Sequence, residues 1–141
     1  MKYNGKVVIV TGAGRGIGRC VAAEFASEGA KVILAEKDAA KGTEAGRRIV
    51  SGGGDAFFIR TDVSIPGEVA AMVRQTSEKY GRIDILVNNA GFGIWKSPLD
   101  LSPEEWDEVI NTNLRGTFLC TREAARIMKE QGGGSVINIA S

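Results

Sequence analysis

Residues 7–18 read VVIVTGAGRGIG, and this stretch decides the fold of the chain. Four consecutive apolar residues predict a buried strand, and the glycines behind them predict a tight turn that leads into a helix. Glycines let the backbone turn sharply and approach a ligand without a Cβ in the way, and the helix start offers unpaired N–H groups. A buried strand, a glycine-rich turn and a helix are therefore the arrangement that holds a pyrophosphate.

The order of apolar and polar segments predicts the architecture of the rest of the chain. Short strand-like runs alternate with segments whose apolar residues recur at helical spacing. Strands are expected at residues 6–10, 31–35, 56–59, 83–87 and 135–140, and helices at 17–28, 39–50, 66–80 and 103–130. Strands separated by helices favour a parallel α/β sheet with helices on both faces, and right-handed crossovers narrow it to a doubly wound sheet.

Capping residues and glycines mark the expected helix ends. Ser64 is the expected cap of the third helix. Residues 102–105 read SPEE, which predicts a capping box between Ser102 and Glu105 with a proline at the first helical position. Triple glycines at 52–54 and 132–134 end the second and fourth helices.

Composition excludes several classes of function. Apolar residues make up 43% and charged residues 25% of the chain, and the net charge of +1 indicates neither a nucleic-acid nor a membrane partner. The chain has no histidine, which removes Ser-His-Asp catalysis and His-ligated metals, so no metal site is expected. The two cysteines, Cys20 and Cys120, lack CxxC spacing and fit a reducing, cytoplasmic location.

The glycine-rich turn carries Gly12, Gly16 and Gly18 in the spacing T-G-x-x-x-G-x-G rather than the strict G-x-G-x-x-G. Such a turn is either a nucleotide-binding loop or a plain strand–turn–helix corner, and its place in the first βαβ unit favours nucleotide binding. Glu36 ends the second expected strand. There an acid can accept both ribose hydroxyls of an adenosine; the alternative is a solvated loop carboxylate.

Five motifs, taken in order, resemble the short-chain dehydrogenase/reductase family over all 141 residues. After the glycine-rich turn come Asp62-Val63, residues 88–91 (NNAG), residues 111–114 (NTNL) and residues 136–141 (VINIAS). The resemblance implies a Rossmann-type domain over residues 1–141 with strand order 3-2-1-4-5. It assigns the cofactor to Gly12, Arg15, Gly16, Ile17, Gly18, Glu36, Asp62, Val63, Asn89, Ala90 and Gly91.

The same resemblance places catalytic residues at Asn113 and Ser141. Asn113 falls on a helix stripe that is otherwise mainly apolar, so its amide must find partners or incur a desolvation cost of about 1–3 kcal/mol. Two interpretations remain open from the sequence. Asn113 is either a structural asparagine that bonds a neighbouring backbone group or, as in the family, part of a proton relay through an ordered water.

The implied activity is interconversion of a small-molecule alcohol and ketone by hydride transfer with a nicotinamide dinucleotide, in a homo-oligomer. The family uses a Tyr-x-x-x-Lys pair as acid and base, and neither Tyr3 nor Tyr80 has a lysine four residues later. These residues therefore resemble the cofactor-binding portion of such an enzyme, ending at the catalytic serine, and we expect them to be inactive alone. The alternative is a non-catalytic nucleotide-binding module.

Two residues bear on the choice of cofactor. A carboxylate at Glu36 would repel the 2′-phosphate of NADP, whereas Arg15 in the glycine-rich turn could pair with that phosphate. The free-energy cost of repulsion between Glu36 and a 2′-phosphate is harder to offset than the cost of leaving the flexible Arg15 without a phosphate partner. NAD is therefore the expected cofactor, with NADP as the alternative.

Overall fold

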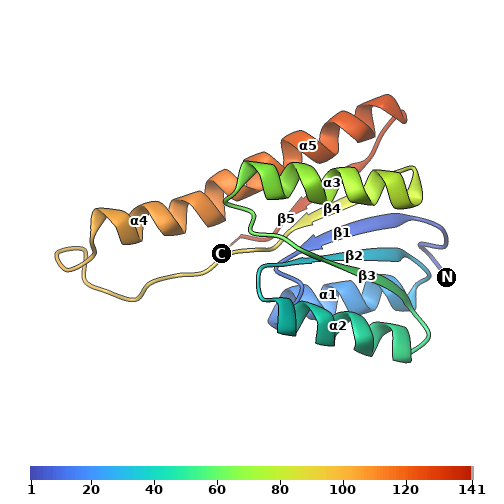
Figure 1. Ribbon diagram of the computed structural model, residues 1–141, viewed down its shortest axis with the longest axis horizontal. Helices are drawn as coiled ribbons and strands as arrows, with labels where there is room; N and C mark the ends of the chain where they lie inside the picture. Colours follow the sequence, from blue (N-terminus) through green and yellow to red (C-terminus); the bar gives the residue numbers. More distant parts are fainter. Residues whose placement is uncertain (141) are drawn as a thin grey trace.

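The computed structural model describes residues 1–140, and the predicted catalytic Ser141 lies outside them. The described residues form a five-stranded parallel sheet in the order β3-β2-β1-β4-β5 (Figure 1). The strands are β1 (Val7–Thr11), β2 (Lys31–Glu36), β3 (Asp55–Arg60), β4 (Ile85–Asn88) and β5 (Ser135–Asn138). This order confirms the predicted doubly wound, Rossmann-type sheet.

Helices cover both faces of the sheet (Figure 1). The helices are α1 (Gly16–Ser27), α2 (Ala39–Ser51), α3 (Pro66–Tyr80), α4 (Pro103–Ile110) and α5 (Gly116–Glu130), with a π-helical segment η1 (Asn111–Arg115) between the last two. α1 and α2 lie on one face, and α3 and α5 lie on the other.

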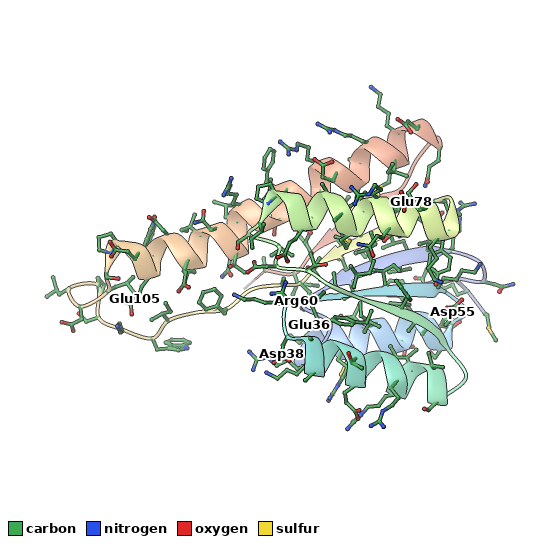
Figure 2. The ribbon with its side chains drawn as sticks, viewed as in Figure 1. Glu36, Asp38, Asp55, Arg60, Glu78 and Glu105 are labelled. Atoms are coloured by element: carbon green, nitrogen blue, oxygen red, sulfur yellow. The ribbon has the colours of Figure 1, made fainter. Side chains whose placement is uncertain are left out.

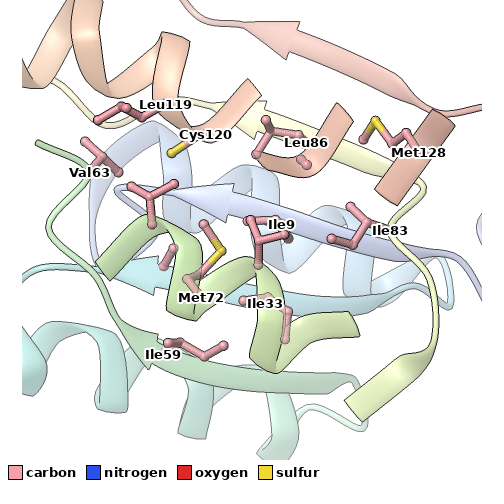
Figure 3. Packing of buried hydrophobic residues seen from close by; sticks show 14 residues of the cluster. Ile9, Ile33, Ile59, Val63, Met72, Ile83, Leu86, Leu119, Cys120 and Met128 are labelled. Atoms are coloured by element: carbon pink, nitrogen blue, oxygen red, sulfur yellow. The ribbon is translucent and has the colours of Figure 1, made fainter. Parts of the chain in front are cut away.

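Alternate residues of each strand fill two separate cores. On the α1/α2 face, Val8 and Val10 pack with alanines of α1 and with Ile49 of α2. On the α3/α5 face, Ile9 packs with Met72 of α3 and with residues of α5 (Figure 3). Each fully buried aliphatic side chain contributes roughly 1.5–3 kcal/mol, so both faces of the central strands stabilise the sheet.

Two helix features of the structure differ from those expected from the sequence. Ser64 does not cap α3: its N–H and hydroxyl donate to Asp62 Oδ1 at 3.0 and 2.6 Å, and Ile65 is the residue that precedes the helix. The helix expected at 103–130 is interrupted by the π-helical segment η1. The capping box is confirmed, since Glu105 N–H donates to Ser102 Oγ at 3.1 Å and the Glu105 carboxylate accepts from Ser102 N–H at 3.0 Å.

The fourth and fifth strands are shorter than predicted. β4 begins at Ile85 rather than at residue 83, because the N–H and C=O of Ile83 bond the side-chain amide of Gln131 at 3.1 and 2.6 Å. β5 ends at Asn138 and pairs with β4 at the edge of the described sheet. Its Val136 and Ile137 side chains are about two-fifths exposed, at 38% and 41%.

The helical rod formed by α4, η1 and α5 extends well beyond the sheet at its α4 end (Figure 1). α4 has no buried residue among those described. Trp106, Leu114 and Phe118 are 58%, 65% and 57% exposed along this rod. The stripe predicted to be apolar is therefore an open surface.

Asp84 joins β1 to β4 at the amino ends of the strands. Its carboxylate accepts from Val7 N–H at 2.9 Å, from Arg82 at 2.6 and 2.8 Å, and from Lys6 at 3.3 Å. Burial alone would raise the pKa of this carboxyl, but Arg82, the Val7 N–H and Lys6 outweigh burial and hold the pKa below its usual range. Asp84 is therefore held as a carboxylate in the folded protein.

Thr11 joins the same two strands at their carboxyl ends. Its buried hydroxyl donates to Val87 O at 3.4 Å and accepts from the N–H groups of Asn89 and Ala90, both at 3.0 Å. The side-chain amide of Asn89 donates in return to Thr11 O at 3.1 Å and to Gly12 O at 3.2 Å. The chain that leaves β4 is thereby tied to the chain that leaves β1.

Asp84→Asn should lower the free energy of unfolding by about 2 kcal/mol at pH 7, because charge-assisted hydrogen bonds to a buried carboxylate are lost. A lowered folded pKa contributes stability that is present above the unfolded pKa of about 3.9 and is lost as the pH falls through the folded pKa. Urea unfolding across pH 2–7 should therefore show the deficit shrinking at the acid end. The exposed Asp107→Asn is the control; an equal loss in both variants would refute the assignment.

Thr11→Val keeps the shape of the side chain but removes the acceptor for two N–H groups. It should lower the free energy of unfolding by roughly 1–3 kcal/mol in urea titrations. Thr43→Val, on the exposed side of α2, serves as the control for the same chemical change. A loss at Thr11 no larger than that at Thr43 would mean that the hydroxyl does not hold the strands together.

Candidate functional site

A cleft of about 1080 Å³ opens at the carboxyl ends of the strands. In a sheet of this order the chain leaves neighbouring β1 and β4 toward opposite faces, and ligands of doubly wound sheets bind in the crevice that results. Except for Gly18, all the residues that the sequence assigns to the cofactor line this cleft: Gly12, Arg15, Gly16, Ile17, Glu36, Asp62, Val63, Asn89, Ala90 and Gly91. Asn113, Ile139 and Ala140 line it as well.

The floor of the cleft depends on close backbone approach at Gly12 and Gly18. Gly12 has a φ of +62°, and a Cβ there would lie 2.9 Å from Ala90 Cα. A Cβ at Gly18 would lie 2.3 Å from Gly12 O and 2.4 Å from Asn89 Nδ2. Gly18 therefore acts outside the cleft, by letting α1 pack against the end of β1.

The start of α1 is suited to an anion. Its N-cap residue, Arg15, makes no side-chain capping bond, and its first turn has no acidic residue. By contrast, the Asp38 side chain caps α2 through Lys41 N–H at 3.1 Å, Ser102 caps α4, and α3, which also lacks a side-chain cap, carries Glu68 in its first turn. Uncapped N–H groups at the positive end of a helix dipole bind phosphate, and here Gly16 and Ile17 line the cleft.

Glu36 lies beside this helix start, at the end of β2. Oε2 accepts from Gly14 N–H at 2.9 Å, and Oε1 accepts from Asp38 N–H at 3.0 Å. Glu36 and Asp38 lie close together at the carboxyl ends of the strands, whereas Asp55 lies at the opposite, amino ends (Figure 2). Glu36 is therefore a fixed, half-buried carboxylate rather than a freely solvated one.

Asp62 lies two residues after the end of β3, and its side chain is also held in place. Ser64 donates to Oδ1 through its N–H and its hydroxyl, and the Lys37 ammonium lies 3.3 Å from Oδ2. Burial raises the pKa of the Asp62 carboxyl, but the Ser64 and Lys37 contacts outweigh it and leave the pKa below its usual range. Asp62 thus offers an ionised acceptor at the cleft. Ser64 and Lys37 were not predicted for these roles, although a serine two residues after an aspartate is a recognisable turn signal.

The Asn113 side chain bonds the loop that follows β4. Oδ1 accepts from Phe92 N–H at 3.0 Å, and Nδ2 donates to Phe92 O at 2.8 Å. Gly91 lies directly beside it, since a Cβ there would be 3.1 Å from Asn113 Oδ1. These contacts agree with the structural interpretation of Asn113, in which its amide bonds a neighbouring backbone group. The residue belongs to η1, and such π-helical turns occur frequently at functional sites.

The far wall of the cleft is aromatic and open. Phe92 and Trp95 of the loop after β4 line it, and the Trp95 side chain is 98% exposed. Ile139 and Ala140 also line the cleft; they follow β5 and lead directly to Ser141, which lies outside the described residues.

Residues 1–140 contain no group of three or more His, Cys, Asp or Glu side chains arranged to hold a metal ion. None of their helices is both long and apolar enough to cross a lipid bilayer.

Several known proteins similar to this chain are oxidoreductases. It is 46% identical to an uncharacterized oxidoreductase of Thermotoga maritima, over 97% of this chain and 54% of that protein. It is 38% identical to a 3-oxoacyl-[acyl-carrier-protein] reductase of Synechocystis, over 96% of this chain and 56% of the reductase. A metagenomic short-chain oxidoreductase, solved in complex with NADP, superposes with a TM-score of 0.96 at 39% identity, over 100% of this chain and 64% of that one.

The chain thus spans about half the length of the curated relatives it matches. The model of the short chain dehydrogenase family matches residues 6–141, which includes the glycine-rich turn and the ends of all five strands. This chain belongs to the short-chain dehydrogenase/reductase family of oxidoreductases.

Proposed function

We propose that the cleft binds a nicotinamide dinucleotide, with NAD preferred, and that the protein interconverts a small-molecule alcohol and a ketone. One observation carries this proposal: residues from the glycine-rich turn and from the ends of β2, β3 and β4 converge on a single cleft. The dinucleotide-binding domain comprises residues 1–141 in this proposal. The oxidoreductase relatives favour this function over a non-catalytic nucleotide-binding module.

The residues present fit each part of a dinucleotide. The uncapped start of α1, at Gly16 and Ile17, would hold the pyrophosphate. Glu36 would accept the hydroxyls of the adenosine ribose. Asp62 and Val63 would contact the adenine, and residues 89–91 would line the groove toward the nicotinamide. When bound, the nicotinamide ring supplies or accepts the hydride.

Two residues would serve the reaction itself. Ser141, directly after the cleft-lining Ala140, would hydrogen-bond the reacting oxygen of the substrate. Asn113 would organise a proton relay, and because its amide is engaged by Phe92, it would act by positioning the loop and the backbone around it. The acid and base of the family, a Tyr-x-x-x-Lys pair, would come from outside these residues.

The charges around the adenosine end support NAD. Lys37 is paired with Asp62 and Lys41 with Asp38, so two of the nearby cations are already neutralised. Glu36 adds a carboxylate where a 2′-phosphate would lie, and repulsion between like charges disfavours NADP. Arg15 lines the cleft and is the cation that would favour NADP, the dinucleotide bound by the metagenomic neighbour.

We also propose a homo-oligomer and a cytoplasmic location. The exposed Trp106, Leu114 and Phe118 on the α4–α5 rod would be covered by a second copy. Free, unpaired cysteines at 20 and 120 fit a reducing compartment.

Dinucleotide binding can be tested with NADH, which accepts excitation energy from tryptophan; Trp95 lines the cleft. Titration should give saturable quenching of tryptophan emission. Ile17→Glu places a carboxylate at the uncapped start of α1 and should weaken NADH binding about tenfold or more through repulsion of the pyrophosphate. Val50→Glu, on an exposed position of α2, makes the same change away from the cleft. Unsaturable quenching, or equal affinity in both variants, would contradict the proposal.

Glu36→Ala should weaken NAD binding and ease NADP binding, because it removes both the ribose acceptor and the charge that repels a 2′-phosphate. Calorimetric titration of each dinucleotide measures the two affinities. Asp107→Ala, on α4 and away from the cleft lining, is the control for loss of a carboxylate. Equal NAD affinity in Glu36→Ala and the parent protein would remove Glu36 from the ribose contact.

A further inference from the structure

Gly14, at an unassigned position of the glycine-rich turn, is packed against the side chain of Glu36. A Cβ at Gly14 would lie 2.8 Å from both Glu36 Cγ and Glu36 Oε2, and 2.9 Å from Lys41 Cβ. The φ of Gly14 is not in the left-handed region, unlike those of Gly12 and Gly16. Space, rather than backbone conformation, therefore excludes a side chain at this position.

We propose that Gly14 determines which dinucleotide the cleft accepts, although it lies outside the residues assigned to the cofactor. By lacking a side chain it leaves room for the Glu36 carboxylate at the adenosine end of the cleft, and its N–H holds Oε2 there at 2.9 Å. This inference rests on the proposed binding of a nicotinamide dinucleotide and on the role of Glu36 in it.

A methyl group at Gly14 would displace Glu36 rather than the helix behind it. Lys41 lies in the first turn of α2, and that helix packs so closely on β3 that a Cβ at Gly42 would lie 2.1 Å from the Phe58 ring. The Glu36 side chain is half-buried and held at its tip by two N–H groups, so it can rotate away at the cost of those bonds. Glu36 therefore yields on its side of the methyl group, while the 2.9 Å approach to Lys41 Cβ has to relax slightly.

Displacement of Glu36 changes the balance of charge in a predictable direction. NAD loses an acceptor for its ribose hydroxyls, whereas NADP loses the repulsion of its 2′-phosphate. Arg15 remains at the cleft, while Lys37 and Lys41 are paired with Asp62 and Asp38. Gly14→Ala should thus reduce the preference for NAD over NADP about tenfold or more, the size of one charge-assisted hydrogen bond.

The experiment measures the dissociation constants of NAD and NADP by calorimetry for the parent protein, Gly14→Ala and Gly67→Ala. Gly67 lies in the exposed first turn of α3, and a Cβ there meets nothing within 4 Å. A lowered preference in Gly14→Ala alone supports the inference. An unchanged preference in Gly14→Ala overturns it while the proposed function stands, and a parent protein that binds neither dinucleotide overturns both.

A second pair of variants tests whether the effect passes through Glu36. In a Glu36→Ala background the contacts of the new methyl group with Glu36 Cγ and Oε2 are gone and only its 2.9 Å approach to Lys41 Cβ remains, so Gly14→Ala should leave the ratio of the two dissociation constants unchanged. A further change in the double variant would overturn the inference. Circular dichroism would reveal whether the single Gly14→Ala protein is too crowded to fold. In that case the double variant can still be measured.

Discussion

The structure depends on one close approach, between the glycine-rich turn after β1 and the chain that leaves β4. Gly12 lies against Ala90, Gly18 lies against the Gly12 carbonyl, and neither contact leaves space for a Cβ. Hydrogen bonds between the two chain segments hold this approach: Asn89 N–H donates to the Thr11 hydroxyl, and the Asn89 side chain donates to the carbonyls of Thr11 and Gly12. Because α1 starts within this contact, its uncapped N–H groups are fixed at the mouth of the cleft. Separating the two strand ends would remove the cleft along with the packing.

Most polar residues of the cleft are engaged by the protein itself. Glu36 holds two backbone N–H groups, Asp62 is held by Ser64 and Lys37, and Asn113 holds the backbone of Phe92. Such contacts fix the positions of acceptors before a ligand arrives, which lowers the entropy cost of binding. They also mean that substitution of one of these residues alters the shape of the cleft as well as a contact. For this reason the choice of control variants matters more here than at a site of free side chains.

Local signals predicted the parallel sheet with helices on both faces, the glycine-rich turn and Glu36, whereas the strand order and the other cleft-lining residues were predicted from the resemblance to the short-chain dehydrogenase/reductase family. Apolar runs and helical spacing identify the elements, and the fixed handedness of crossovers then limits the topology. Features that depend on which of several partners a side chain bonds, or on the exact backbone hydrogen bonding of a helix, were not predicted. Ser64 is a residue type that commonly caps helices, but its hydroxyl bonds Asp62 instead. The π-helical turn around Asn113 does not alter the spacing of the apolar residues. Gly14 looks like a spacer until the path of Glu36 is known.

The side chains in one part of the cleft are held in place by neighbouring residues, and those in another part are largely exposed. At one end, the carboxylates of Glu36 and Asp62 are fixed by neighbours in the segments that follow β1, β2 and β3. Elsewhere in the cleft lining, Trp95 is almost fully exposed and Ile139 is 43% exposed. A fixed acceptor discriminates strongly between ligands, whereas an exposed apolar wall discriminates weakly. Under the proposed function, the choice of cofactor would therefore be a property of Glu36 and Asp62, and the exposed aromatic loop after β4 would contribute little to the choice of alcohol or ketone.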